Sequence, residues 1–351
     1  MREERENSSR GEGARRGMQA FVVDGSACSL CERPVPTPAE GEALVRVLIA
    51  GVCNTDLEIM KGYMGFSGVV GHEFVGVVES APQAHEQMVG KRVVGDINLA
   101  CCKATCSTCS RGGDRARNHC PNRTVLGILG KDGTYASYLT LPVALLHVVP
   151  DHISTENAAF TEPLAAACRI VEQGLISPGD AVAIVGDGKL GLLIAEVVAR
   201  FASSNRCPIP ALVGRHPERL TKIPSADSLT FIDSVQASPS HDKKFDVVVD
   251  ATGSPEGLKL CTALTRPMGT LVLKSTCAAG ADFNTAPFVI DELVVAGSRC
   301  GPFPEALRML ATGLDLTPLI DATLPLSEAT KAVETASKKG ILKVQIRVSS
   351  D

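Results

Sequence analysis

The sequence predicts an α/β protein with a strand-rich first part and a doubly wound parallel sheet in its second part. Its 351 residues are enough for two domains with substantial cores. Between Gln19 and about Pro150, short apolar runs alternate with glycine and proline, which is typical of strands and turns. From Asp180 onward, strand-like and helix-like patterns alternate, which indicates parallel strands joined by crossover helices.

The first part contains four apolar segments that we expect to be strands. They are Ala43–Ala50, Phe74–Glu79, Lys91–Gly95 and Tyr135–Leu141. Short strands bounded by turns in this way favour a partly open barrel. The chain then becomes helical between Asp151 and Gly174, where apolar residues recur at helical spacing through Ala158–Val171.

The second part contains six apolar strand candidates. They are Ala181–Gly186, Ala211–Gly214, Leu229–Ile232, Asp246–Ala251, Thr270–Lys274 and Leu293–Ala296. Amphipathic helices are expected between several of them, for example at Leu190–Phe201 and Pro255–Leu264. Strands that are apolar throughout are expected in a parallel sheet that helices cover on both faces.

The two ends of the chain carry different signals. We expect residues 1–17 to be a disordered tail, because they are charged and polar and lack the apolar core of a secretory signal. We also expect a polar loop at Ser234–Lys244. Near the C-terminus the pattern predicts two helices and a last strand, at Pro304–Thr312, Leu326–Lys338 and Lys343–Val348.

The composition argues against several classes of partner. Charged residues make up 21% of the chain and the net charge is -4, so we expect no nucleic acid or anionic membrane as a partner. Aromatic residues make up only 4% and tryptophan is absent, which argues against a base-stacking surface. Apolar runs such as Ala181–Val185 are too short to cross a bilayer.

The thirteen cysteines predict a reducing, cytoplasmic compartment, where thiols serve in metal binding or core packing. Cys28 and Cys31 form a C-x-x-C pattern without the strand–helix context of a redox motif, so we expect ordinary surface or core thiols there. Five further cysteines are expected to act as small apolar residues: Cys168, Cys207, Cys261, Cys277 and Cys300.

Residues 51–76 carry a candidate catalytic metal site. They contain G-V-C-N-T-D-L-E and, after a glycine-rich gap, G-H-E-F-V-G. Cys53, His72 and Glu73 offer a thiolate, an imidazole and a carboxylate, a set that suits zinc. Three protein ligands with a fourth position left open are typical of a zinc site that performs chemistry.

Two neighbours of this cysteine strengthen the prediction. Thr55 offers a relay hydroxyl, and Asp56 offers a carboxylate that can orient a ligand histidine. The alternative is a buried free cysteine and an ordinary core histidine. Either residue alone would favour that alternative, but the whole set favours a metal.

The segment A-V-A-I-V-G-D-G-K-L-G-L-L carries a candidate dinucleotide site. Gly186, Gly188 and Gly191 have the G-x-G-x-x-G spacing, at the end of an apolar strand and the start of a helix. Such a turn brings the backbone close to a pyrophosphate, which binds at the helix N-terminus. The alternative, an ordinary strand–helix turn, fits the following alternation less well. Further expected cofactor contacts are Asp187, Lys189, Leu190 and Thr252.

The end of the second strand, L-V-G-R-H-P-E-R-L, bears on the choice of cofactor. An acidic residue there usually binds the 2′-hydroxyl of NAD, whereas the 2′-phosphate of NADP needs space and positive charge. Gly214 offers no carboxylate, while Arg215 and His216 can donate hydrogen bonds. We therefore predict that NADP is preferred to NAD. The alternative is that Arg215 is only a solvated surface charge.

Three motifs in this order, G-V-C-N-T-D, G-H-E-F-V-G and V-G-D-G-K-L-G, resemble the zinc-containing, alcohol dehydrogenase-like medium-chain dehydrogenase/reductase superfamily. The resemblance covers nearly the whole chain after the tail. It implies a GroES-like catalytic domain at residues 18–160 and 300–351 and a Rossmann domain at residues 161–299. It also implies a homo-oligomer, either a dimer or a tetramer.

The stretch T-E-P-L-A, which contains Glu162, is similar to the branch of polyol, threonine and glucose dehydrogenases. This resemblance implies that Cys53 and His72 bind a catalytic zinc, and that Glu73 and Glu162 share or exchange the other positions with water. The stretch T-D-L-E-I is similar to archaeal glucose dehydrogenases, with Glu58 where many relatives have a relay histidine.

A second cysteine cluster resembles the structural zinc lobe of the same superfamily, which spaces its ligands C-x2-C-x2-C-x7-C. Here one C-x2-C interval is kept, the last cysteine follows after ten residues, and the first ligand is one of two adjacent cysteines. The candidate ligands are Cys101, Cys102, Cys106, Cys109 and Cys120. We expect zinc there, with free thiols as the alternative and His119 as a less expected ligand.

These implications predict a zinc-dependent, NADP- or NAD-linked oxidoreductase. The expected reaction interconverts a small-molecule alcohol, such as a polyol or sugar, and its carbonyl by hydride transfer. One alternative is a zinc-independent enone or quinone reductase, which would lack the pair Cys53 and His72. Another is a cofactor-binding relative without turnover, which the complete set of candidate ligands disfavours.

Overall fold

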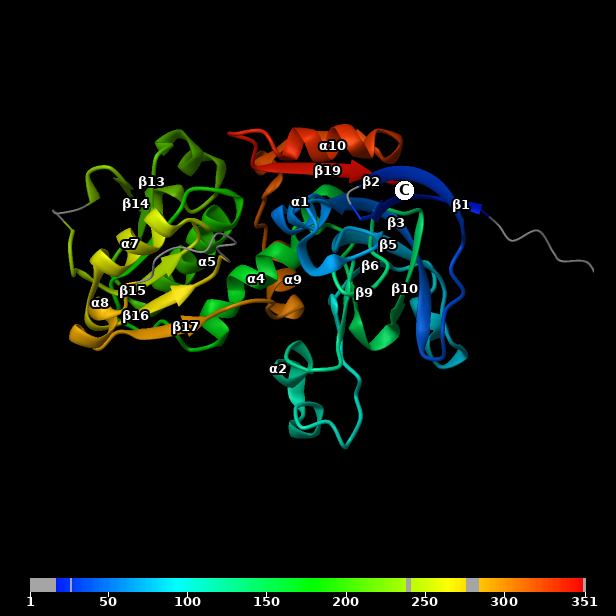
Figure 1. The fold of residues 1–351 in the computed structure, drawn as a ribbon, viewed down its shortest axis with the longest axis horizontal. Coiled ribbons are helices and arrows are strands. Elements are labelled where there is room, and N and C mark those ends of the chain that lie inside the picture. The colour runs from blue at the N-terminus through cyan, green and yellow to red at the C-terminus, as the bar shows by residue number, and fades with distance from the viewer. Residues whose placement is uncertain (1–16, 26, 238–240, 276–283, 350–351) are drawn as a thin grey trace, which may run out of the picture.

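The computed structural model describes residues 17–25, 27–237, 241–275 and 284–349, and it contains two lobes that lie side by side (Figure 1). The expected N-terminal tail lies outside the described residues, except that Gly17 already begins the first strand. Cys277 and residues 238–240 of the expected polar loop also lie outside them.

The first lobe is built on a seven-stranded sheet that joins both ends of the chain. Its order is β11-β6-β5-β3-β19-β18, and β10 also pairs with β3. The strands are β3 (Glu42–Gly51), β5 (Glu73–Ser80), β6 (Arg92–Gly95), β10 (Tyr138–Pro142), β11 (Leu146–Val148), β18 (Ile320–Pro325) and β19 (Lys343–Arg347). A smaller sheet consists of β1 (Gly17–Asp24), β2 (Ala27–Pro34) and β4 (Gly68–Val69).

The pairing of β3 with β5 depends on a glycine. A Cβ atom at Gly76 would lie 2.5 Å from the Val45 side chain and 2.6 Å from the carbonyl oxygen of Arg46. Only glycine therefore allows the two strands to approach at this point. This pairing places Glu73, the first residue of β5, opposite Gly51 at the end of β3, and His72 directly precedes Glu73.

The second lobe is a six-stranded parallel sheet in the order β14-β13-β12-β15-β16-β17 (Figure 1). Its strands are β12 (Val182–Val185), β13 (Ala211–Gly214), β14 (Thr230–Asp233), β15 (Phe245–Asp250), β16 (Thr265–Leu273) and β17 (Val294–Gly297). The order reverses between β12 and β15, which is the switch point of a Rossmann fold. All six predicted strands are present, and the α/β fold class is confirmed.

Helices pack against this sheet. They are α5 (Lys189–Asn205), α7 (Pro255–Leu264) and α8 (Ala286–Ile290). The strand β12 is buried along its whole length, as expected for a strand that is apolar throughout. The 3-10 turns Pro217–Lys222 and Ala226–Ser228 connect β13 to β14.

A shared core holds the two lobes together. Between them lie α3 (Thr155–Ala158), α4 (Thr161–Glu172) and α9 (Phe303–Ala311) (Figure 1). One contiguous hydrophobic cluster includes Ile49 and Val75 of the first lobe, Leu164 of α4 and Ile184 of the second lobe. This packing fixes the glycine turn after β12 relative to the first sheet.

The C-terminal segment returns to the first lobe. The strand β19 pairs antiparallel with β3, so that Gln345 lies opposite Gly51. The helix α10 (Ala329–Ala336) packs on β19 and β18. This return brings Lys343, at the start of β19, close to the residues that follow β3. The predicted boundaries of the domains stay predictions, but these sheets contain residues from both ends of the chain.

A small excursion carries the second cysteine cluster. It consists of β7 (Asn98–Leu99), β8 (Thr124–Leu126), β9 (Gly130–Lys131) and α2 (Gly113–Asn118). Figure 1 shows α2 and the loops around it projecting below the two lobes, whereas β9 lies within the first lobe. Among the described residues, no helix combines the length and the apolar character needed to span a bilayer.

Candidate functional site

The structure brings Cys53, His72 and Glu73 together. Each offers one ligand atom, and these atoms lie within 4.8 Å of one another. Cys53 is the N-cap of α1 (Asn54–Met60), whereas His72 and Glu73 stand at the start of β5. Because a thiolate, an imidazole and a carboxylate converge from two elements, this donor set fits a divalent ion such as zinc.

A buried carboxylate orients the histidine of this cluster. Oδ1 of Asp56 lies 3.1 Å from Nδ1 of His72, and its Oδ2 accepts a hydrogen bond of 2.9 Å from the Tyr135 hydroxyl. Oδ2 also accepts a hydrogen bond of 2.9 Å from the backbone N–H of Cys53. Because Nδ1 is engaged in this way, Nε2 of His72 is the nitrogen left for a metal.

The same contacts control ionisation in the metal-free protein. Burial disfavours the Asp56 carboxylate, but the charge and hydrogen bond of His72 outweigh it and lower the pKa of Asp56. Burial also disfavours the imidazolium, yet Asp56 and Cys53 raise the pKa of His72 well above its ordinary value. The cluster therefore contains charges that are paired with one another. A cation that binds there would compete with the imidazolium for its negative partners.

Sequence reasoning missed Lys343, which forms a buried ion pair with Glu73. The two residues are 270 positions apart, and Lys343 is only 3% exposed. Its ammonium group also lies 5.7 Å from the centroid of the Phe160 ring. A buried carboxylate without such a partner would be costly, so Lys343 stabilises Glu73 in the metal-free protein. The only signal in the sequence was a lysine at the start of the predicted final strand, which reads K-V-Q-I-R.

Two other predicted residues, Thr55 and Glu58, lie on α1. Oγ1 of Thr55 lies 3.8 Å from the sulfur of Cys53. Glu58, on the same helix, forms an ion pair of 2.9 Å with Lys61, and their side chains are 44% and 70% exposed. Glu58 is therefore paired at the surface.

Glu162 lies in the first turn of α4 and is outside the group of converging ligand atoms. Burial raises the pKa of Glu162 to about 7, with opposing effects from His72 and Glu73. These electrostatic effects place its carboxyl group within the same environment as the cluster.

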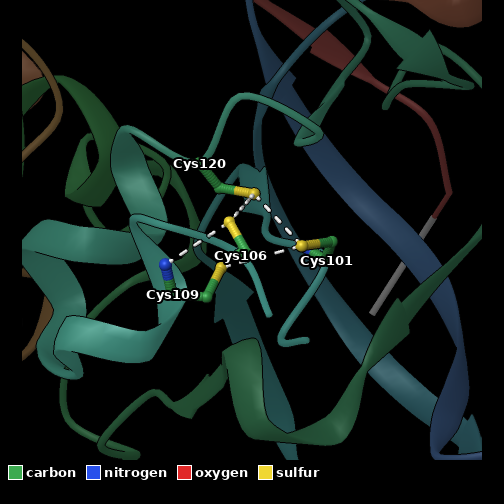
Figure 2. Close-up of side chains that lie close together, drawn as sticks. All are labelled: Cys101, Cys106, Cys109 and Cys120. Atoms are coloured by element: carbon green, nitrogen blue, oxygen red, sulfur yellow. Dashed lines mark hydrogen bonds between the residues drawn. The ribbon is translucent and has the colours of Figure 1, made fainter. Parts of the chain in front are cut away.

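The second cluster contains Cys101, Cys106, Cys109 and Cys120, whose sulfur atoms converge (Figure 2). The sulfur–sulfur distances are 3.8 Å between Cys101 and Cys109, 3.9 Å between Cys106 and Cys120, and 3.5 Å between Cys120 and Cys101. A tetrahedral site with metal–sulfur distances of about 2.3 Å has edges of about 3.8 Å. The four thiols therefore fit a structural zinc.

The structure distinguishes between the two candidates for the first ligand. Cys101 joins the cluster, whereas Cys102 is exposed and its thiol lies 3.5 Å from the carbonyl oxygen of Ala100. Cys102 also has a positive φ of 52°, a backbone conformation that residues other than glycine rarely adopt. His119 is exposed and is not a member of the group.

Backbone N–H groups support the thiolate form in this loop. The N–H of Cys109 lies 3.5 Å from the sulfur of Cys106, and hydrogen bonding from it lowers the pKa of Cys106 to about 6. The N–H of Cys101 likewise lies 3.5 Å from the sulfur of Cys120, whose pKa is also lowered. Thiolates held in this way are suitable metal ligands.

The remaining predicted core thiols are partly as expected. Cys168 and Cys261 are buried, whereas Cys207 and Cys300 are half-buried. Cys28 and Cys31 lie on β2, also half-buried. All described cysteines are free thiols.

The glycine motif forms the turn between β12 and α5. Gly186 has a positive φ of 114°, and a Cβ atom at Gly191 would lie 1.8 Å from the carbonyl oxygen of Gly186. Gly188 is the N-cap of α5, so the first N–H groups of this helix are available to a phosphate. Leu190 packs against the shared core behind the turn.

Two further predicted contacts flank this turn. The hydroxyl of Thr252, just after β15, donates a hydrogen bond of 2.7 Å to Asp250. Burial lowers the pKa of Lys189, and the nearby groups Cys53 and Glu73 oppose this shift. Lys189 therefore lies within electrostatic reach of the metal cluster, which links the helix after the glycine turn to the first lobe.

At the end of β13, Asp187 of the glycine motif meets the segment that was expected to contact the adenosine ribose. Its Oδ2 atom accepts hydrogen bonds from the backbone N–H groups of Arg215 and His216, at 2.7 and 2.6 Å. Gly214 ends the strand directly before them. The predicted residues Gly214, Arg215 and His216 thus meet Asp187, a contact that the sequence did not predict.

Comparison with known proteins adds independent information. The model of the alcohol dehydrogenase GroES-like domain matches residues 39–151. The chain is 31% identical over 326 residues to the D-altritol 5-dehydrogenase of Agrobacterium fabrum, which covers 88% of this chain and 92% of that protein. It is 30% identical over 339 residues to the L-threonine 3-dehydrogenase of Saccharopolyspora erythraea. This match covers 91% of this chain and 96% of that protein.

Solved structures give the same picture. A zinc-binding dehydrogenase from Sinorhizobium meliloti, described as putative and bound to NADP, superposes with a TM-score of 0.82 at 26% identity, over 95% of this chain and 100% of that one. The alcohol dehydrogenase rspB of Escherichia coli CFT073, complexed with NADH, superposes with a TM-score of 0.82 at 25% identity. The match covers 95% of this chain and 99% of that one.

Proposed function

This chain belongs to the zinc-containing, alcohol dehydrogenase-like medium-chain dehydrogenase/reductase superfamily, and we propose that it is a zinc-dependent dehydrogenase of polyols, sugars or related alcohols. The proposed reaction converts a small-molecule alcohol and an oxidised nicotinamide cofactor into a carbonyl compound, the reduced cofactor and a proton. Dehydrogenases of altritol and threonine are among the relatives, which supports a polar, hydroxylated substrate.

One observation carries this proposal: a three-donor cluster suited to zinc lies within electrostatic reach of the helix that follows the glycine turn. Cys53, His72 and Glu73 would hold the ion, with Glu162 as a further carboxylate nearby. A zinc ion held there supplies Lewis-acid polarisation of the reacting oxygen. The proximity of Lys189 to these ligands supports a cofactor on the glycine turn beside the same site.

The chain's own residues have distinct roles in this proposal. Asp56 fixes the ring of His72 through Nδ1, and Tyr135 in turn fixes Asp56, so the imidazole is held in one orientation. Lys343 holds Glu73 in a buried ion pair, which limits how strongly Glu73 can bind a cation. The hydroxyl of Thr55, beside Cys53, is the proposed first acceptor of the proton that the substrate loses.

The role of Glu58 in proton transfer stays a prediction. Its ion pair with Lys61 engages the carboxylate at the surface of α1, so transfer through Glu58 would follow that through Thr55. The sequence-based prediction of NADP over NAD also stays a prediction. It rests on Gly214, Arg215 and His216, and the relatives include one structure with NADP and one with NADH.

The four-thiolate cluster is proposed to hold a second, structural zinc. Its four sulfur atoms occupy every position of a tetrahedral site, so it leaves no position for a substrate. We assign it to the stability of the projecting loop between β7 and β8.

Self-association is proposed through the edge of the Rossmann sheet. The strand β17 is the last in the sheet order, and its Val294 and Val295 are exposed. Val289, Ile290 and Met268 are exposed nearby in the chain or on the neighbouring strand. An exposed apolar edge strand favours pairing with a second copy of the chain.

A cytoplasmic location remains a prediction from the free thiols.

An activity screen tests the proposal. Zinc-loaded protein is incubated with polyols, aldoses and amino alcohols, each with NAD and with NADP, and reduction of the nicotinamide is followed at 340 nm, its usual absorbance maximum. We expect reduction with at least one polyhydroxylated alcohol, and its loss after removal of the metal. Turnover that persists without metal would instead support the zinc-independent reductase. Tight cofactor binding with no turnover over the whole panel would support a non-catalytic relative.

A further inference from the structure

Four hydrogen-bond donors converge on one carboxylate at the end of β13. Oδ2 of Asp187 accepts from the N–H groups of Arg215 and His216, and it lies 3.0 Å from Nδ1 of the His216 ring. Nη1 of Arg219 lies 3.4 Å from Oδ1 and donates to the backbone carbonyl of Asp187 at 3.1 Å. Asp187 is only 6% exposed.

The glycine at the end of β13 makes this contact possible. A Cβ atom at Gly214 would lie 2.6 Å from both Cβ and Oδ2 of Asp187. In a Rossmann fold the residue at this strand end usually carries the carboxylate that recognises the 2′-hydroxyl of the adenosine ribose. Here the strand end has no side chain, and a carboxylate from the glycine turn occupies the space beside it.

The donors around Asp187 are those that a 2′-phosphate requires. Two backbone N–H groups, an imidazole and a guanidinium form an anion-binding arrangement beside the expected ribose position. Burial disfavours the Asp187 carboxylate, but the hydrogen bonds from Arg215 and His216 outweigh it and lower the pKa of Asp187. The internal anion is therefore ionised at neutral pH and satisfies these donors.

We propose that Asp187 determines the choice of cofactor, because its carboxylate occupies the donors of a 2′-phosphate and so disfavours NADP relative to NAD. This inference rests on the proposed function, since it requires a nicotinamide dinucleotide on the glycine turn. A 2′-phosphate would have to displace Asp187 or lie against a second negative charge. A 2′-hydroxyl meets no such repulsion. Among the described residues, Oδ1 has one contact, at 3.4 Å, and retains the capacity to accept the hydrogen bond of the hydroxyl.

This inference changes what Gly214 implies. The absence of an acidic residue at the strand end indicated NADP only if Arg215 and His216 were free to bind phosphate. Asp187 engages the backbone N–H groups of both residues and the ring of His216, so the glycine accommodates a carboxylate that arrives from another part of the fold. The preference for NADP is therefore expected to emerge when that carboxylate is removed.

The test compares two ligands that differ only in the 2′ group. Calorimetry measures the dissociation constants of 5′-AMP and 2′,5′-ADP for the zinc-loaded full chain and for Asp187→Asn and Asp187→Ala. We expect the affinity for 2′,5′-ADP relative to 5′-AMP to rise about tenfold or more in both variants. Asp233→Asn is the matched control, because Asp233 is exposed and lies opposite Gly214 on the neighbouring strand. It should change the ratio by less than about threefold.

The outcomes separate this inference from the proposed function. If both nucleotides bind but their ratio is unchanged in Asp187→Asn and Asp187→Ala, the role of Asp187 is refuted and the proposed function stands. An equal shift in Asp233→Asn also refutes it, because any nearby charge would then suffice. If neither nucleotide binds to any protein, both the inference and the proposed function fail. The ratio of Michaelis constants for NADP and NAD should move in the same direction as the binding ratio.

Discussion

The two cysteine-containing clusters of this chain differ in how the fold assembles them. The four thiols of the projecting loop lie within one short stretch, from Cys101 to Cys120, and Figure 2 shows their sulfur atoms facing one another. The cluster around Cys53 instead draws its donors from a helix N-terminus and a strand, and its supporting residues from three further segments. One cluster is local, and the other depends on the whole first lobe.

This difference has a chemical consequence. Four sulfur ligands complete a tetrahedral site, so the loop cluster can bind a metal only as a structural element. Three mixed donors leave one ligand position open. Two of these donors have charged partners, because Asp56 contacts His72 and Lys343 forms an ion pair with Glu73. A buried, partly compensated charge set of this kind is typical of a functional site. The comparison therefore predicts separate effects of mutations in the two clusters.

The largest effect is expected from Cys53→Ser. Loss of the thiolate should remove the ion from the first cluster and lower turnover about 10³-fold, because metal-ion catalysis is worth several kcal/mol. Metal content by mass spectrometry should fall from two zinc ions per chain to one. Cys28→Ser, at a half-buried cysteine on β2, is the control and should retain both ions and activity. Full activity in zinc-free Cys53→Ser protein would show that the first cluster does not hold a catalytic metal ion.

The second prediction contrasts two adjacent cysteines. Cys101→Ser should lose the zinc of the loop cluster and reduce the free energy of unfolding by roughly 3 kcal/mol, because folding of the loop is coupled to metal binding. Cys102→Ser should change neither quantity, since Cys102 is exposed and outside the cluster. Denaturant unfolding and metal analysis measure both. A metal loss in Cys102→Ser, with Cys101→Ser unaffected, would reverse our assignment of the first ligand.

A smaller effect is expected from Asp56→Asn, which keeps the shape of the side chain but removes the charge behind His72. Residues that orient a ligand histidine are worth about 10–100-fold in metal affinity. Competition with a zinc chelator measures this loss at the first cluster, while the loop cluster should be unchanged. Asp24→Asn, at an exposed carboxylate on β1, serves as the control. Equal zinc affinity in Asp56→Asn and the native protein would show that Asp56 is not needed.

The smallest effect concerns pH. In the metal-free protein the pKa of Glu162 is raised from 4.5 to about 7. The folded state then binds more protons than the unfolded state between these values, so this contribution to stability is complete below pH 4.5 and is lost as pH rises through 7. Because the side chain is only partly buried, we expect the change to be about 2 kcal/mol.

Glu162→Gln isolates this contribution. Relative to the native chain, the variant should gain stability as the pH rises from 4.5 to 7.5, when urea unfolding of the two metal-free proteins is compared. A difference that stays constant over this range would show that burial does not raise the pKa of the Glu162 carboxyl group.

The fold was predictable because its signals are local. Apolar runs with turns at their ends located the strands of the Rossmann sheet, and the structure places Pro255–Leu264 as a helix with the predicted bounds. The strands β2 and β18 were not singled out, because much of each is exposed and their sequences are more polar. Such strands are defined by their pairing partners more than by their own pattern.

The candidate site was predictable only in part. Cys53, His72 and Glu73 share two short motifs, so their ligand chemistry is visible in the sequence. Lys343 was missed, because its approach to Glu73 depends on the return of β19 to the first sheet. The contact of Asp187 with the end of β13 was missed for a similar reason, since it requires two turns to meet in space. Cys101 and Cys102 could be distinguished only by their backbone conformation.

The central claim is that a divalent ion bound by Cys53 and His72 performs chemistry, while a second ion stabilises the loop. Anomalous scattering at the zinc edge, from crystals grown with the cofactor, tests this most directly. We predict two peaks per chain. One should lie within bonding distance of Cys53 Sγ and His72 Nε2 and face the nicotinamide, and the other should lie among the four loop sulfurs. A map with a peak only in the loop, or with Cys53 and His72 turned away from the nicotinamide, would contradict the account.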